Sequence, residues 1–439
     1  MRFQLEHSST SVHRIGKLIA TSIGHEVTLD TPGCFLYTRY GSVPFLAPDV
    51  YETIRSIPSF ALIPMFYIAE RKMVLKKFSK GVRQFCGLGT RATFVCQTDP
   101  VDTPLISAAD KSSVPVWATG GRIQLSIENY AECISVAHPH AYQAPTDNET
   151  SLFIAKTSGR KRCGNSVLRT KTYLELLSAY RERNVDLSKI PVFLSPGGGN
   201  DPEWRLTAVE ETDFSIASGV VLDGFFHSGH EESTNGQIAD KNDSSLFSLL
   251  PAVCEKLPPN LPRFLTGVWQ PPDIVLATKC GVDVFDGSLP YRLTRSALAW
   301  IYPGWDGSHT SDTNNATRMC AHRPYITFPL DDSAADSTSV LYTTPIQSGC
   351  TCFACQRHTQ GYISHLHIAG EMLGPMLLMI HNSHLYYRFF EDLRLAARTN
   401  RLDEFFRFVE PLRFPRELLA VDKTNESKSA SVSSLNGTT

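Results

Sequence analysis

The chain has 439 residues, with 42 Lys+Arg against 44 Asp+Glu, and 42% of its residues are hydrophobic, a composition that excludes disorder over most of its length. A formal net charge of −2 excludes binding to nucleic acid through bulk charge alone. The longest apolar runs, residues 60–69 and 376–380, fall short of the roughly 18 residues that a membrane-spanning helix needs, and the first residues lack the apolar core of a secretion signal.

The first charged feature along the chain is a basic run opposed only by Glu70. It consists of Arg71, Lys72, Lys76, Lys77, Lys80 and Arg83. Most such runs are solvated helix faces, and the alternative is contact with an RNA backbone or with anionic lipid.

Five short apolar or β-branched runs end abruptly at glycine or polar residues, which predicts buried strands followed by loops. They cover residues 114–121, 190–199, 219–226, 264–268 and 282–287. Stretches with apolar residues at helical spacing, residues 172–183 and 273–279, lie between them. This alternation predicts an α/β fold with parallel strands, and we expect a (β/α)8 barrel of the TIM type, although a doubly wound sheet has the same local pattern.

The remaining segments set the expected domain organisation. We assign residues 1–340 to the barrel, with polar surface insertions near 227–245 and 306–317, and residues 341–396 to a metal-binding subdomain. Residues 397–421 are expected to form a helical segment that completes the barrel. Residues 422–439 have no apolar face and are predicted to be a disordered tail.

A cysteine cluster near the C-terminus carries the strongest chemical signal. The chain has 11 cysteines, too few for a disulfide scaffold of this length, which favours a reducing, cytoplasmic setting. Cys350, Cys352 and Cys355 form C-x-C-x2-C, and His381 follows after 25 intervening residues. Three thiolates and one imidazole suit one structural Zn²⁺ with no open position for water. The alternatives are reduced cysteines in a loop or a disulfide.

The fourth ligand and the surrounding helix leave choices open. His358, His365, His367 and His384 also lie near the cluster. Residues 372–398 have helical periodicity, and five arginines follow along or after this helix. They are Arg388, Arg394, Arg398, Arg401 and Arg407, which either form a solvated face or contact RNA phosphate or a partner.

At these motifs the chain resembles the tRNA-guanine transglycosylases, or queuine tRNA-ribosyltransferases, which exchange guanine at the tRNA wobble position for queuine or its precursor. The resemblance rests on the cysteine pattern with His381 and Asn382, on residues 262–268 followed by 272–275, and on residues 281–286 followed by 289–292. It extends from about residue 30 to about residue 415. The resemblance implies a (β/α)8 barrel with a zinc subdomain inserted near the C-terminal end.

This chain departs from the catalytic members of that family. Where they carry an Asp as general base in T-D-S-G-G at a barrel strand end, we align Trp117-Ala118-Thr119-Gly120-Gly121, which places Ala118 at the base position. A methyl group accepts no proton, so about 10²–10⁴-fold of acid–base catalysis would be lost. The family's Q-G-G loop is replaced by residues 195–199, and Phe225 and Phe226 are expected to fill space that a purine needs.

Asp286 stands at the position of the family's nucleophile, although D-G is also a common turn dipeptide. The resemblance is therefore to the accessory, non-catalytic branch, and implies a heterodimer with a catalytic subunit, tRNA as a further partner, and a role in queuosine modification of tRNAs with G-U-N anticodons. It also implies a cytoplasmic pool with peripheral attachment to the mitochondrial outer membrane. The alternative is an active transglycosylase that uses Asp286 as nucleophile together with Asp147.

Overall fold

The computed structural model describes residues 1–6, 13–101, 109–118, 120–147, 159–199, 201–225, 244–307, 324–330 and 342–415. The predicted insertions at 227–245 and 306–317 lie outside these ranges except for two residues each, and the predicted tail at 422–439 lies wholly outside them. No helix of the described ranges is both long and apolar enough to cross a membrane.

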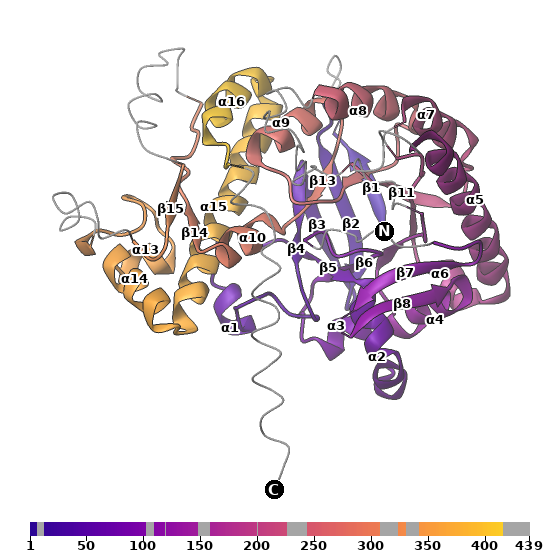
Figure 1. Ribbon diagram of the computed structural model, residues 1–439, viewed down its shortest axis with the longest axis horizontal. Helices are drawn as coiled ribbons and strands as arrows, with labels where there is room; N and C mark the ends of the chain where they lie inside the picture. Colours follow the sequence, from indigo (N-terminus) through magenta and orange to yellow (C-terminus); the bar gives the residue numbers. More distant parts are fainter. Residues whose placement is uncertain are drawn as a thin grey trace, which may run out of the picture.

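Eight parallel strands close into a barrel, which confirms the predicted fold class (Figure 1). Their order around the barrel is β10-β11-β12-β13-β4-β5-β6-β9. The strands are β4 (Gly33–Tyr37), β5 (Phe60–Pro64), β6 (Ala92–Cys96), β9 (Ala141–Gln143), β10 (Val192–Leu194), β11 (Ala217–Leu222), β12 (Arg263–Leu265) and β13 (Val284–Asp286). Four of the five predicted runs therefore contain barrel strands, because strands buried on both faces have continuous apolar sequences.

The barrel interior is filled by aromatic side chains from alternate strands. Phe35, Phe94, Phe193 and Phe264 come from β4, β6, β10 and β12, and the rings of Phe35 and Phe264 lie 4.9 Å apart. Phe94 is 5.0 Å from Phe193 and 5.4 Å from Phe264. A Cβ on Gly219 of β11 would lie 2.2 Å from the Phe193 ring, so this glycine makes room for it. The layer is the packing expected of a (β/α)8 barrel.

Helices surround the barrel and follow its strands. They are α1 (Pro48–Tyr51), α2 (Met65–Phe78), α3 (Gly81–Phe85), α4 (Ile127–Ala137), α5 (Gly159–Arg183), α6 (Val185–Lys189), α7 (Pro202–Glu211), α8 (Ser244–Lys256), α9 (Pro271–Lys279) and α10 (Leu289–Arg295). The predicted helices at 172–183 and 273–279 are confirmed as parts of α5 and α9. Side-chain caps begin α4 and α7, where Ser126 and Asp201 accept backbone N–H bonds.

An antiparallel sheet covers the N-terminal end of the barrel. It consists of β1 (Arg2–Leu5), β2 (Gly16–Ser22) and β3 (His25–Thr31). Nε of Arg14 lies 3.1 Å from Oδ1 of Asp283, which immediately precedes β13. Burial raises the pKa of Asp283 to about 7, and the nearby Arg14 charge opposes this rise. Arg14 thus fixes the sheet to the base of the barrel.

One predicted strand is not part of the barrel. Residues 114–121 fall on an antiparallel ribbon of β7 (Ser113–Ala118) and β8 (Gly121–Ser126), inserted between β6 and α4. The expectation that Ala118 ends a barrel strand is therefore wrong. The apolar run of β7 is buried because the ribbon packs against α2 and α4, and a buried ribbon strand has the same local sequence as a barrel strand.

The C-terminal region forms a second body beside the barrel, at the left of Figure 1. It contains β14 (Leu298–Trp300), β15 (Tyr325–Thr327), α13 (Phe353–Arg357), α14 (Gln360–Ala369) and α15 (Leu373–Arg398), followed by α16 (Leu402–Val409) and a 3-10 turn, η2 (Glu410–Leu412). The helix predicted at 372–398 is confirmed as α15. This helix contacts both α13 and β4, so the predicted boundary at residue 396 falls within an element that the barrel and the subdomain share.

Candidate functional site

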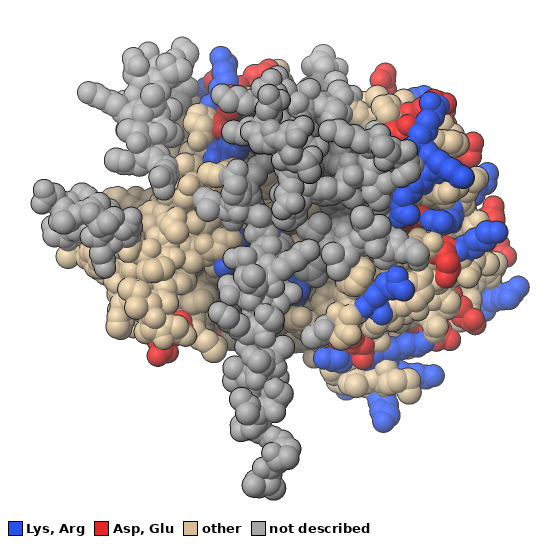
Figure 2. Space-filling model, in the orientation of Figure 1, with Lys and Arg blue, Asp and Glu red and all other residues tan. Residues whose placement is uncertain are grey.

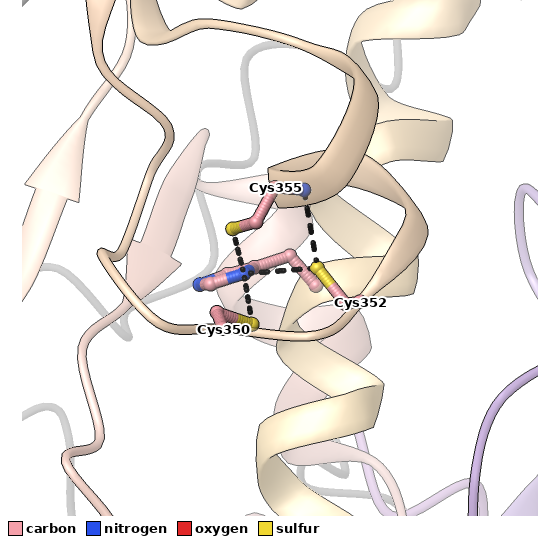
Figure 3. A group of neighbouring side chains, drawn as sticks. Cys350, Cys352 and Cys355 are labelled. Atoms are coloured by element: carbon pink, nitrogen blue, oxygen red, sulfur yellow. Dashed lines mark hydrogen bonds between the residues drawn. The ribbon is translucent and has the colours of Figure 1, made fainter.

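The structure brings Cys350, Cys352, Cys355 and His381 into one buried cluster whose ligand atoms all lie within 4.8 Å of one another (Figure 3). Nδ1 of His381 lies 3.8, 3.5 and 3.3 Å from the Sγ atoms of Cys350, Cys352 and Cys355, respectively. Three sulfurs around one imidazole nitrogen form the donor set of a closed tetrahedral metal site. It is the one such group found within the described ranges.

Local structure explains why the three thiols converge. Cys352 caps the N-terminus of α13, where its sulfur accepts the backbone N–H of Cys355 at 3.4 Å. Gly349, with φ +74°, makes the turn that precedes Cys350.

The backbone of strand β14 orients the histidine ligand. Nε2 of His381 lies 2.8 Å from the carbonyl oxygen of Trp300, to which it donates when Nδ1 faces the sulfurs. The next residue, Asn382, accepts the Trp300 N–H at 2.9 Å and donates to the Leu298 carbonyl at 2.9 Å. His384, a candidate ligand from the sequence, instead places Nε2 3.3 Å from the Thr351 hydroxyl. Strand β14 therefore fixes the ligand helix α15 at His381.

Asp286 ends β13 at the C-terminal face of the barrel and is only 2% exposed. Its Oδ2 accepts the Gly267 N–H at 2.7 Å, and its Oδ1 accepts both the N–H of Ser288, at 3.1 Å, and the Ser288 hydroxyl. Burial raises the pKa of this carboxyl to about 7, against the effect of these hydrogen bonds. A carboxylate held in this way supports the strand-end turn and is a poor nucleophile.

The structure shows a buried carboxylate, that of Asp99, at the C-terminal face of the barrel, called the barrel mouth below. The sequence analysis did not single it out. Barrel strand β6 is followed by Gln97, Thr98 and Asp99. Asp99 is 3% exposed, and its oxygens accept the Tyr37 hydroxyl at 2.8 and 2.9 Å and the Val101 N–H at 3.0 Å. The apolar run at 92–96 was the available signal.

Polar groups at the barrel mouth bond to one another. Gln143 donates to Oδ2 of Asp223 at 2.9 Å and accepts the Gln97 N–H at 2.9 Å. Oδ1 of Asp223 accepts the Gly224 N–H at 2.7 Å and lies 3.3 Å from the Thr266 hydroxyl. These side chains come from the ends of β6, β9, β11 and β12, and each of them makes at least one hydrogen bond within the protein.

Arg205 of α7 holds together two loops that replace the family's base-recognition segments. Its guanidinium donates to the carbonyls of Pro196, Gly199 and Asp223 at 3.1, 2.8 and 2.9 Å. The side chain is 2% exposed and lies 4.3 Å above the ring of Phe225, which is itself buried. Burial lowers the pKa of Arg205 to about 10, so it stays charged at neutral pH. Phe226 lies outside the described residues.

Asp147 does not pair with Asp286. Its Oδ2 lies 2.9 Å from Nη1 of Arg169, and its N–H donates to the Thr170 hydroxyl at 3.1 Å, so its contacts are with α5. Strand β9, which precedes Asp147, stands across the barrel from β13 in the strand order. The carboxylate pair that an active enzyme was expected to use is absent from the described contacts.

Comparisons with known proteins agree with the resemblance. A family model described as queuine tRNA-ribosyltransferase matches residues 9–411. Proteins named queuine tRNA-ribosyltransferase accessory subunit 2 are similar to the chain. That of Xenopus tropicalis is 30% identical and that of Danio rerio 29% identical, each over 407 residues that cover 89% of this chain and 94% of the relative. That of Homo sapiens is 26% identical over 404 residues, with the same coverage.

Proposed function

The chain belongs to the queuine tRNA-ribosyltransferase family, and from this premise we propose that it is the non-catalytic accessory subunit of a heterodimer whose other chain exchanges guanine for queuine in tRNA. Relatives that cover 89% of the chain carry the accessory-subunit name. The tRNAs would be those with G-U-N anticodons, so the product is the queuosine modification.

The observation that supports this proposal most strongly is the burial and hydrogen bonding of the Asp286 carboxyl group. A nucleophile must be accessible to its substrate, whereas Asp286 is only 2% exposed and Gly267 and Ser288 already fill three of the roughly four acceptor sites of its carboxylate. The mouth residues Gln143 and Asp223 are likewise bonded to each other. Base exchange needs donors and acceptors directed at the base edge, and these ones are directed at the protein.

The test is queuine-for-guanine exchange on a G-U-N tRNA with this chain alone, the catalytic subunit alone, and both together. We expect exchange in the mixture, and none with this chain alone. Exchange by this chain alone that disappears in Asp286→Ala would overturn the proposal and restore the enzyme alternative.

We propose that the ion of the cysteine cluster is one structural Zn²⁺. Tetrahedral bonds of about 2.3 Å to sulfur and 2.0–2.1 Å to nitrogen place sulfur and nitrogen about 3.5 Å apart, close to the observed 3.3–3.8 Å. Four protein ligands leave no position for a catalytic water. Held by Cys350, Cys352, Cys355 and His381, the ion would fix α13 against α15.

The partner subunit would dock on the zinc-binding subdomain. Phe353 and Tyr362 are 51% and 42% exposed, and His358 lies between them with ring distances of 5.9 and 5.3 Å. Figure 2 shows few charged side chains over α13 and α14, in contrast to the barrel side. Exposed aromatic clusters of this kind mark protein interfaces. Phe353→Ser with Tyr362→Ser should therefore abolish co-purification with the catalytic subunit while the metal is retained, and an intact heterodimer would reject this surface.

We propose a cytoplasmic location with a fraction attached peripherally to the cytosolic face of the mitochondrial outer membrane, as family resemblance suggests. Fractionation followed by a carbonate wash would release such a fraction from mitochondria. Recovery of the chain inside protease-resistant mitochondria would reject this location.

A further inference from the structure

We propose that the β7–β8 ribbon and the outer face of α2 form one RNA-contact surface, with Trp117 stacking on an unpaired base and basic side chains of both elements contacting phosphates. This inference rests on the proposed function, because it concerns the tRNA that the complex modifies.

In the basic run on α2 and α3, some side chains are paired with other groups of the protein, and others are exposed and could bind a phosphate. Lys72 contacts Glu132 and Asn129 of α4, and Arg83 donates to the Gly89 carbonyl. Lys76 and Lys77, by contrast, are exposed and make no hydrogen bond or ion pair with any residue of the described ranges. Two neighbouring lysines without acidic partners provide the local positive potential that a phosphate backbone needs.

The ribbon extends this surface toward the barrel mouth. It packs against α2 through β7, and β8 continues directly into the N-terminus of α4, which lies at the C-terminal face of the barrel because α4 runs back to the start of β9. Within it, Trp117 and Arg122 are directly opposite each other across the two strands. Trp117 is partly exposed and Arg122 is exposed. An indole beside a guanidinium is a typical stacking platform for a splayed base.

The two elements lack acidic side chains apart from Glu70. Residues 113–126 contain no Asp or Glu, and on α2 Glu70 contacts Arg71 at 3.3 Å. Blue side chains gather at the lower right of Figure 2, over α2, on the side of the molecule away from the zinc-binding subdomain, which shows few charges. The surface thus stays open when a partner occupies the subdomain, and it can carry RNA from the barrel mouth along α2. Exposed Met73 and Val74 would contact ribose.

The experiment measures binding of a G-U-N tRNA by the assembled heterodimer across a series of salt concentrations. We expect Lys76→Glu with Lys77→Glu to weaken binding about tenfold at low salt, and to reduce the slope of log affinity against log salt by about 0.7–0.9 for each phosphate that the variant does not neutralise. The matched control is Lys189→Glu with Lys256→Glu, which changes the charge equally at lysines already paired with Asp186 and Glu210. The control should bind as the parent does.

Trp117 is tested separately, because stacking does not depend on salt as phosphate binding does. Trp117→Ala should weaken tRNA binding at least about fivefold with an unchanged salt slope, and Trp117→Phe should restore most of the affinity. Restoration by Phe also excludes a collapsed ribbon as the cause.

Three outcomes would overturn the inference. One is parental tRNA affinity in both variants while the heterodimer still binds more tightly than the catalytic subunit alone, which leaves the accessory role intact and rejects this surface. Another is a lysine variant that loses binding to vesicles containing phosphatidylserine but keeps its tRNA affinity, which assigns the surface to lipid. If the catalytic subunit alone binds and modifies tRNA as well as the heterodimer does, the proposed function fails as well.

Discussion

The barrel mouth and the cysteine cluster are both buried groups of reactive side chains, and they differ in what completes them. At the mouth, Asp286 and Asp223 accept hydrogen bonds from neighbouring backbone and side-chain groups, so the protein itself occupies these groups. In the cluster, three sulfurs face the same nitrogen of His381, and one ion can join all four. The comparison teaches that buried polar groups show a ligand site only when protein partners leave their bonding capacity unused.

The largest expected effect comes from removing one member of the cluster. Cys352→Ser should abolish stoichiometric zinc, lower the midpoint of thermal unfolding and weaken heterodimer formation, because structural zinc contributes on the order of 10 kcal/mol in small domains. Metal analysis and calorimetry measure the first two effects, and co-purification measures the third. Cys280→Ser, at a partly exposed cysteine outside the cluster, is the control.

Loss of zinc in Cys352→Ser with heterodimerisation intact would separate the metal from the interface. Full zinc occupancy in the same variant would show that the cluster is not the binding site.

The next largest effect is expected at Arg205, whose hydrogen bonds hold two loops together at the barrel mouth. Arg205→Met should lower the free energy of unfolding by about 3–5 kcal/mol, because three buried carbonyls lose their donor at a cost of about 1–3 kcal/mol each. Urea unfolding measures the change, with Arg205→Lys as an intermediate variant. A loss below about 1 kcal/mol would show that these loops are held by other interactions.

A smaller effect concerns the pH dependence of stability. The pKa of Asp286 is raised to about 7 in the folded chain, above its ordinary value, so the folded state binds the proton more tightly. Its contribution to stability is therefore full below about pH 4 and is lost as the pH rises through about 7. Asp286→Asn should make the fall in unfolding free energy between these pH values shallower.

In Asp286→Asn, part of the fall in unfolding free energy with rising pH should remain, because the pKa of Asp283 is also raised to about 7. An unchanged slope in the variant would show that Asp286 does not titrate in this range. Exchange by the assembled complex should remain within about twofold of the parent, because Asp286 has a structural role in this chain.

The smallest effect is expected at Ala118. If a missing base at this residue were the cause of inactivity, Ala118→Asp would restore exchange by this chain alone. Because Ala118 lies on the ribbon and not at a barrel strand end, we expect no exchange and a stability change below about 1 kcal/mol. Measurable exchange by Ala118→Asp alone would show that the missing carboxylate at residue 118 is the cause of inactivity.

Prediction from the sequence succeeded where a local pattern has one structural meaning. The runs at 190–199 and 282–287 are barrel strands because continuous apolar sequence is what a doubly buried strand requires. The C-x-C-x2-C spacing places three thiols on one turn, and His381 meets them as expected. The run at 114–121 failed because a ribbon strand buried by α2 and α4 gives the same pattern.

Composition and spacing by themselves determined an α/β fold of alternating strands and helices and a cysteine cluster suited to a metal, because both depend on short-range periodicity and on donor chemistry. Only the tertiary structure decided which carboxylates stand at the mouth and whether they are available. Asp99 and Asp286 are distant in sequence, yet both act on the Cys96 thiol, whose pKa burial raises and their charges raise further. Their hydrogen bonds come from Tyr37, Gly267 and Ser288, and closure of the barrel alone brings such residues together.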